Sequence, residues 1–268
     1  MGMDTMPGER EPAARAIDVL IWLADHASGS TGDTWGVREV ARAMNASPST
    51  VYRIFQVFES RDLVTKNEDG RYTPGLELFR ICQVFSQRLS PVRIAKPHLE
   101  KLALACGETV LLAAYGARRG QMIVIDIIDA PHPLRWVVRL NQWNAIHSGA
   151  TGLAILAFLP EAERQALYQR ELERFTERTL VTAADLEAEA ARVRARGYAY
   201  SQGQRSQGAV GFGAPLFDAK GDVFGDVCIT IPEGRFDPAQ ETKLGSLLVT
   251  AAADISADLH GAGFLRDA

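Results

Sequence analysis

The stretch Val37–Pro74 constrains the fold of this 268-residue chain more than any other. It predicts two short helices joined by a tight turn, with a hairpin directly behind them. Ser47-Pro48 favours a helix start, because serine can cap the helix and proline gives up only an amide N–H that would lack a partner there. Asp69-Gly70, between the β-forming segments Leu63–Thr65 and Arg71–Thr73, is typical of a hairpin turn. The order helix, turn, helix and hairpin predicts a winged helix-turn-helix.

The second helix of this unit, residues 47–61, has two different faces at about 100° per residue. The apolar face is expected to pack on the domain and consists of Val51, Ile54, Phe55 and Phe58. The other face is short, polar and rich in donors, as a helix that enters a DNA major groove requires. An ordinary amphipathic helix with a solvated face is the alternative, but the hairpin behind it favours DNA binding. We predict DNA contacts, with the last two residues touching the backbone, from Ser47, Ser49, Thr50, Tyr52, Arg53, Gln56, Lys66 and Arg71.

Composition limits the function classes only loosely. Hydrophobic residues make up 47% of the chain and charged residues 23%, which describes a globular protein long enough for two domains. The formal net charge is −4, so the chain lacks a global basic signature of nucleic-acid binding. DNA affinity is therefore expected from the placement of a few residues and from two copies acting together.

The cysteines indicate a reducing compartment. They are odd in number, widely spaced and outside any CxxC or histidine cluster: Cys82, Cys106 and Cys228. We expect reduced thiols in a cytoplasmic protein, with no metal and no cofactor. The polar start of the chain does not resemble a signal peptide, and no apolar run approaches the length of a membrane span.

Four parts are expected along the chain. Residues 1–13 are predicted to be a disordered tail, residues 14–74 the winged-helix DNA-binding domain, residues 75–90 a linker helix, and residues 91–262 a second domain. The linker helix has apolar residues on two sides, so it is predicted either to take part in dimerisation or simply to pack against the wing.

Two details of the first domain are also predicted. Its first helix, Ala14–His26, is expected to bury a stripe of Ile17, Leu20, Ile21 and Ala24. The loop 28–33 (SGSTGD) is made of turn residues and is expected to be flexible.

The second domain is predicted to be α+β, built on an antiparallel sheet, because its strands arrive mainly as hairpins with helices between them. The predicted strands are Thr109–Tyr115, Gln121–Asp129, Leu134–Leu140, Tyr198–Gln202, Ala209–Phe217 and Asp222–Ile231. The predicted helices are Val92–Cys106, Ala150–Leu159, Glu161–Phe175, Ala183–Arg196 and Pro238–Leu259.

A run of small residues, Ser148–Gly152 (SGATG), lies at the start of one of these helices. Small side chains leave the backbone N–H groups within reach, and a helix N-terminus favours anions. This pattern predicts a site for the carboxylate of a small organic acid. The alternative is that the small residues only allow the helix to pack closely on the sheet.

The whole chain resembles the IclR family of bacterial transcriptional regulators, named for the isocitrate lyase regulator. The resemblance covers about Arg15–Leu259 and rests on the order of several stretches, among them SPSTVYRIFQVFESRDLV, DGRYTPGLELFRI, IHSGATGLAILAFL and RGYAYSQGQRSQGAVGFGAPLFDAKGDVFGDVCITIP. It implies a winged helix, a linker helix and a C-terminal effector-binding domain. It also implies a homodimer, often paired further into a tetramer, that binds double-stranded operator DNA under the control of a small organic effector.

The resemblance also implies which residues meet the effector. Ala150 and Thr151 fall where backbone amides contact its carboxylate, and Trp136 and Val138 are expected to form an apolar lid. The remaining positions are Ser201, Gln204, Gly211, Cys228 and Thr230. The family usually has glutamate where this chain has Gln204, which removes a negative charge from the site. A role in controlling a catabolic operon is expected from the same resemblance.

An enzyme and an architectural DNA-binding protein are the alternative classes of function. An enzyme with an accessory winged helix would need a catalytic motif, but the sequence contains no GxSxG elbow, no P-loop and no HExxH. The run Gly208–Gly213 (GAVGFG) lies inside a strand-like segment rather than at a helix start, so it does not predict a dinucleotide site. An architectural DNA-binding protein without a ligand would need a filled pocket.

Overall fold

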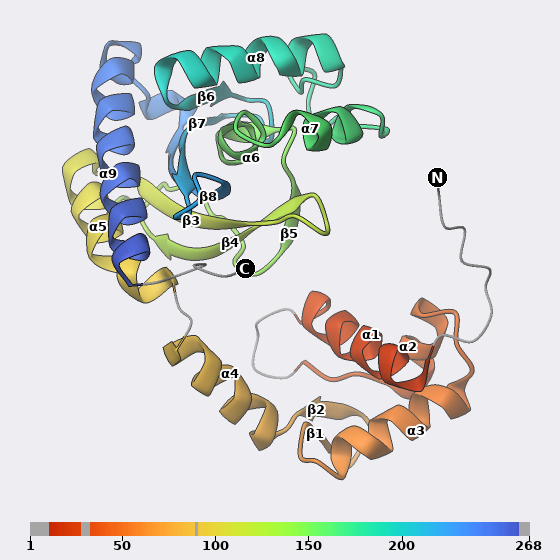
Figure 1. The fold of residues 1–268 in the computed structure, drawn as a ribbon. Coiled ribbons are helices and arrows are strands. Elements are labelled where there is room, and N and C mark those ends of the chain that lie inside the picture. The colour runs from red at the N-terminus through yellow and green to blue at the C-terminus, as the bar shows by residue number, and fades with distance from the viewer. Residues whose placement is uncertain (1–10, 28–32, 89–90, 263–268) are drawn as a thin grey trace. The chain divides into compact units, whose positions relative to one another are not determined.

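The computed structural model describes residues 11–27, 33–88 and 91–262, which divide into two compact units at residues 89 and 90 (Figure 1). Most of the predicted tail and of the predicted loop 28–33 lies outside these ranges. The N-terminal unit contains α1 (Pro12–Asp25), α2 (Val37–Ala43), α3 (Pro48–Glu59), β1 (Val64–Lys66), β2 (Tyr72–Pro74) and α4 (Leu76–Arg88). The C-terminal unit contains α5 (Pro91–Cys106), β3 (Thr109–Gly116), β4 (Gln121–Ile128), β5 (Trp143–Ala145), α6 (Gly149–Leu156), α7 (Glu161–Tyr168), α8 (Ala183–Arg196), β6 (Ala199–Gln202), β7 (Ala209–Phe217), β8 (Val223–Pro232), two short 3-10 turns (Glu233–Arg235 and Pro238–Gln240) and α9 (Glu241–Gly261).

The N-terminal unit is a winged helix. Phe55 of α3 stacks on Tyr72 of the wing, with the ring centroids 4.3 Å apart, and both side chains are fully buried. Trp35 exchanges two backbone hydrogen bonds with Tyr72, of 2.8 and 2.9 Å, so the segment before α2 extends the two-stranded wing. The recognition-type helix and the wing therefore share one hydrophobic core.

The predicted buried stripe of the first helix is wrong. Val19 and Leu23 of α1 are buried, whereas Ile17 is 58% and Ile21 39% exposed. This helix carries apolar side chains on two sides, so its periodicity cannot tell which side packs on α3. Packing on the neighbouring helices selects the Val19 side and leaves the isoleucines on the surface.

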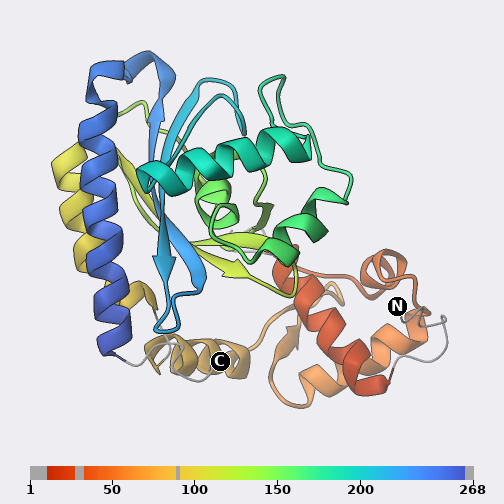
Figure 2. The same cartoon turned by 45° about the horizontal axis from the view of Figure 1, so that its top comes forward.

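The C-terminal unit is an α+β domain on a six-stranded antiparallel sheet in the order β5-β4-β3-β8-β7-β6. Helices α5 and α9 lie side by side on one face (Figure 2), where they share a hydrophobic core with Phe212 and Ile229 of the sheet. Helices α6 and α8 pack on the opposite face, in a core that includes Leu153 and Leu186. The predicted fold class is therefore confirmed.

One predicted strand, Leu134–Leu140, is wrong. The segment forms no strand and lies outside the sheet, and Asn141, directly after it, donates a backbone hydrogen bond of 2.9 Å to the carbonyl of Val124. Its alternating pattern reflects another cause: Trp136 and Val138 turn toward the interior while Val137 is 76% exposed. The short strand β5 takes the sheet edge instead.

Three predicted helices differ in extent, and the one expected over 150–159 ends at Leu156. The helix expected over 161–175 ends at Tyr168, because the following loop is organised around Thr179. The Thr179 hydroxyl accepts from the amides of Phe175 and Thr176 and donates to the Gln204 carbonyl at 2.7 Å. The closing helix begins at Glu241, after a 3-10 turn.

Candidate functional site

The polar face of α3 begins at Ser47, the residue that caps the helix. Ser47 caps the helix, since its hydroxyl accepts from the Thr50 amide at 3.2 Å. The same hydroxyl lies 2.9 Å from the hydroxyl of Ser49 and 2.8 Å from that of Thr50. Ser47 therefore fixes the start of the helix and presents a cluster of hydroxyl groups there.

The remaining polar residues of α3 lie on the surface. Tyr52, Arg53 and Gln56 are exposed, and the Gln56 amide donates to the Tyr52 hydroxyl at 3.3 Å. Val51, Phe55 and Phe58 are buried beneath them. The helix thus offers donors and acceptors on one side while its other side is fixed by the core.

The two predicted residues of the wing differ in their surroundings. The Arg71 guanidinium donates to the carbonyl and hydroxyl of Thr34, at 2.6 and 2.7 Å, and pairs with Glu39 at 2.9 Å. These contacts hold the wing to the segment before α2. Lys66 is exposed, with its ammonium 5.8 Å from the centroid of the Tyr72 ring.

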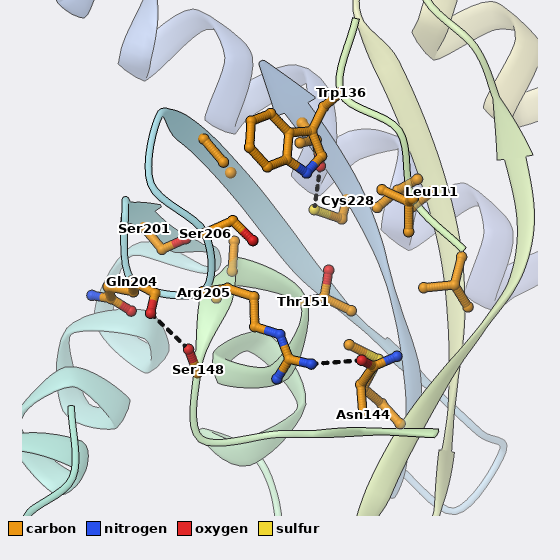
Figure 3. Close-up of a pocket in the computed structure, with 18 of the residues that line it drawn as sticks. Leu111, Trp136, Asn144, Ser148, Thr151, Ser201, Gln204, Arg205, Ser206 and Cys228 are labelled. Atoms are coloured by element: carbon orange, nitrogen blue, oxygen red, sulfur yellow. Dashed lines mark hydrogen bonds between the residues drawn. The ribbon is translucent and has the colours of Figure 1, made fainter. Parts of the chain in front are cut away.

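The C-terminal unit encloses a cavity of about 250 Å³ between the start of α6, the sheet and the segment 136–142 (Figure 3). The structure brings all nine predicted effector residues to its wall: Trp136, Val138, Ala150, Thr151, Ser201, Gln204, Gly211, Cys228 and Thr230. Leu111, Met122 and Val124 of the sheet add apolar surface to the same cavity. Its wall therefore combines an apolar part with a cluster of hydroxyls.

The start of α6 lies against this cavity without a side-chain cap. Ser148 is in the N-cap position, but its hydroxyl donates to the Gln204 carbonyl at 3.1 Å instead of accepting from the helix. The first amides of a helix have no partner inside the helix, so they stay available to an acceptor. A helix N-terminus also carries partial positive charge.

The small residues of this region are needed for close packing as well. A Cβ atom at Gly213 would lie 2.5 Å from the Ala150 carbonyl oxygen, and one at Gly152 would lie 2.5 Å from that of Ile146. Helix α6 therefore rests directly on backbone of β7 and of the turn before it. The packing explanation of the run 148–152 holds, and it places the helix start at the cavity wall.

Arg205 is a cavity residue that the sequence did not single out. Its guanidinium donates to the Asn144 side chain at 2.6 Å and lies over the Phe175 ring, 4.0 Å from the centroid. Burial lowers its pKa. Arg205 lies in a loop, where hydrophobic periodicity cannot predict which side chains are buried. The sequence signal that could have identified it is a single cation close to the predicted anion site.

A buried carboxyl lies on the same face of β8 as Cys228. Asp226 is fully buried, and neither of its carboxyl oxygens has a hydrogen-bond partner among the described residues. Burial raises the pKa of Asp226 well above its ordinary value. Burial and the nearby Asp226 together raise the pKa of the Cys228 thiol to about 12, so this cysteine is a thiol at neutral pH.

The described residues contain neither a cluster of metal ligands nor a membrane-spanning helix. Within residues 11–27, 33–88 and 91–262, no three His, Cys, Asp or Glu side chains are grouped so as to hold a metal ion. None of the helices in the described part of the chain has the length and apolar character needed to cross a membrane.

A winged helix combined with an α+β unit that encloses a ligand-sized cavity defines a ligand-responsive DNA-binding regulator. The family model described as "Bacterial transcriptional regulator IclR C-terminal" matches residues 85–257, and the one described as "IclR helix-turn-helix domain" matches residues 12–68. The chain belongs to the IclR family of bacterial transcriptional regulators. Its first unit is the DNA-binding helix-turn-helix domain, and its second is the effector-binding domain.

Individual relatives span nearly the whole chain. The chain is 26% identical to the transcriptional repressor IclR of Escherichia coli over 251 residues, which cover 93% of this chain and 90% of the relative. It shows the same identity and coverage with the acetate operon repressor of Salmonella typhimurium. A crystal structure of an IclR homolog from Microbacterium hydrocarbonoxydans, in complex with 4-hydroxybenzoate, has a TM-score of 0.79 at 19% identity and covers 94% of this chain and all of that one.

Proposed function

We propose that this protein is a homodimeric regulator of a catabolic operon, whose binding to double-stranded operator DNA is controlled by a small organic acid. The observation that carries the proposal is the charge of the cavity wall. Within the described chain, two arginines and no acidic side chain line this cavity. An anion is the ligand that such a wall favours, because Arg205 is partly removed from water and is stabilised by a charge of opposite sign, and the exposed Arg139 adds a second positive charge.

The proposed ligand lies with its carboxylate at the start of α6. The residues that we propose to contact it are the nine cavity residues predicted from the sequence. One structural relative was solved with 4-hydroxybenzoate, and another relative is named for the acetate operon, so small carboxylates are the acids to test first. In this proposal the protein acts in the cytoplasm, where the operator DNA is.

DNA binding is proposed for the exposed face of α3 and for the wing. In this proposal Ser49, Thr50, Tyr52, Arg53 and Gln56 face the major groove. Ser47 acts by starting the helix, Lys66 touches the DNA backbone, and Arg71 mainly holds the wing in place. Side-chain donors of these kinds read base edges, whereas a contact from lysine to a backbone phosphate fixes position without reading sequence.

The experiment that tests the proposal combines two measurements on the full chain. A thermal-shift screen with acetate, benzoate and 4-hydroxybenzoate identifies an acid that raises the melting temperature. Gel shifts on the operator then compare DNA affinity with and without that acid. Stabilisation together with a changed DNA affinity is expected; no stabilisation by any acid in a broad panel would contradict the proposed ligand class.

Replacing Arg53 by alanine tests the orientation of α3. A change of about 1–3 kcal/mol in operator binding is expected if this side chain reads a guanine. Unchanged operator binding by Arg53→Ala would show that a different face of the helix meets DNA.

The alternative of an enzyme receives no support from the relatives, which are named as transcriptional regulators. We propose that the cavity binds its acid without converting it. Incubating the acid with the protein and analysing the products by chromatography tests this, and turnover would revive the enzyme interpretation.

A further inference from the structure

We propose that Arg205 is the residue that binds the carboxylate of the effector, and that it makes the cavity select an acid with an apolar body over the uncharged counterpart of that acid. This inference rests on the proposed function, because it concerns the ligand of the same cavity. No sequence pattern pointed to Arg205, so the argument depends on the contacts of its side chain.

The guanidinium of Arg205 forms no ion pair within the described part of the chain. Among the described residues, Asn144 is its hydrogen-bond partner, no carboxylate forms an ion pair with it, and its Nη1 atom is buried without any partner. The carboxylate of Glu173, which is exposed, acts on it only from a distance. Arginine stays protonated in proteins, so a full positive charge is held here in a partly buried position. Such a charge is costly unless an anion compensates it.

The guanidinium is held in one orientation. Phe175 supports one side of it and Asn144 fixes one of its ends, while the Arg205 Cβ packs closely on Gly149, where an added Cβ would lie 3.1 Å away. In Figure 3 the side chain extends along the cavity wall between Ser148 and Thr151, toward Asn144. A planar cation fixed in this way recognises a planar carboxylate geometrically as well as by charge.

A second positive feature adjoins it. The uncapped start of α6 carries the partial charge of the helix dipole, so two like-signed groups face one region of the cavity. Both are stabilised by the same anion. The apolar part of the wall, formed by Leu111, Val124 and Trp136, then receives a ligand body without charge. A single carboxylate on an apolar body fits this division better than a sugar or an amine.

The test compares an acid with its uncharged amide. Calorimetric titration of the full chain with benzoate and with benzamide gives two dissociation constants, and their ratio measures charge selectivity. The wild-type protein is expected to prefer the acid at least about tenfold, which corresponds to about 1.4 kcal/mol. Arg205→Gln is expected to bring the ratio to about one with little effect on benzamide, and Arg205→Lys to keep part of the preference.

Arg178→Gln is the matched control. Arg178 is an exposed arginine whose side chain packs on Gly203, in the same loop as Arg205, and it does not line the cavity. It is expected to keep the full preference for the acid. Melting temperatures and circular dichroism of the ligand-free variants establish that each one folds.

The outcomes separate the two proposals. A folded Arg205→Gln variant that still prefers benzoate as strongly as the wild type would overturn the role of Arg205 and leave the proposed effector class intact. Equal loss in Arg178→Gln would show a general effect of charge and would also overturn it. If the wild type binds neither benzoate nor any other carboxylate of a broad panel, both proposals are wrong.

Discussion

At the scale of single residues, Arg205 and Asp226 of the C-terminal unit form no ion pair among the described residues, and they behave differently. Arg205 keeps its charge at the cavity wall, whereas burial raises the pKa of Asp226 well above its ordinary value and so favours its uncharged form. Neither was foreseen from the sequence, since a lone charged residue in a loop or strand carries no periodicity. The hydroxyl and small residues of the cavity were foreseen, because the family resemblance identifies positions rather than charges.

The protonation of Asp226 predicts how stability depends on pH. Its pKa is raised in the folded protein, so the native state holds a proton that the unfolded chain, with a pKa of about 3.9, releases. The contribution of this group to the free energy of unfolding is complete below pH 4 or so and falls as pH rises toward the folded pKa, by about 1.4 kcal/mol per unit.

Replacing Asp226 by asparagine removes this titration. Denaturant unfolding between pH 5 and 8 is expected to show that Asp226→Asn gains stability relative to the wild type as pH rises. Parallel curves for the two proteins across this range would show that Asp226 is charged in the native state.

At the scale of elements, the sequence predicted those whose chemistry is local. The cap at Ser47 and the Asp69-Gly70 hairpin follow from residues next to one another. Contacts from elsewhere in the chain decided the others. The segment 134–140 alternates as a strand does but has no ladder partner, and α1 packs through Val19 rather than through Ile17.

The close packing of α6 on the sheet predicts that a methyl group added at Gly213 lowers stability. In Gly213→Ala the new Cβ would meet the Ala150 carbonyl at 2.5 Å, so the helix start has to move. A loss of about 1–3 kcal/mol of stability is expected, together with weaker binding of the acid.

Gly234→Ala is the corresponding control, since a Cβ there meets nothing within 4 Å. Thermal unfolding and the acid-induced shift are measured for both variants. Equal behaviour of the two would mean that α6 is less closely seated than the contacts indicate.

The exposed phenylalanines of helix α4 predict that this helix forms part of the proposed homodimer interface. Phe79 is 60% and Phe85 58% exposed on this helix, and burial of a phenylalanine contributes about 1.5–3 kcal/mol. Changing both to serine is expected to weaken the proposed homodimer at least about tenfold in sedimentation experiments. Leu104→Ser on α5, where the side chain is 88% exposed, serves as a control that leaves the dimer intact; a dimer that tolerates the first change but not the second would assign the interface to the C-terminal unit.

At the scale of the whole molecule, the two units carry different parts of the function, and thermodynamics connects them. If the acid changes the dissociation constant for operator DNA by some factor, DNA changes that for the acid by the same factor. Titrating each ligand in the presence and absence of the other measures both factors. Arg53→Ala is expected to weaken DNA binding and leave the acid-induced rise in melting temperature unchanged; loss of that rise would show that the two functions are not housed separately.

The segment 136–142, which lines the cavity from outside the sheet, bears on how the ligand of such a regulator can change. Trp136 and Val138 shape the ligand's surroundings from a segment that is not part of the sheet. Substitutions of Trp136 leave the ladder of the sheet unchanged, whereas Val138 also packs against the hydrophobic core on the α6 side of the sheet, so changes there affect packing as well. Trp136 is therefore the position to randomise first when the proposed ligand is to be exchanged, for example in building a biosensor.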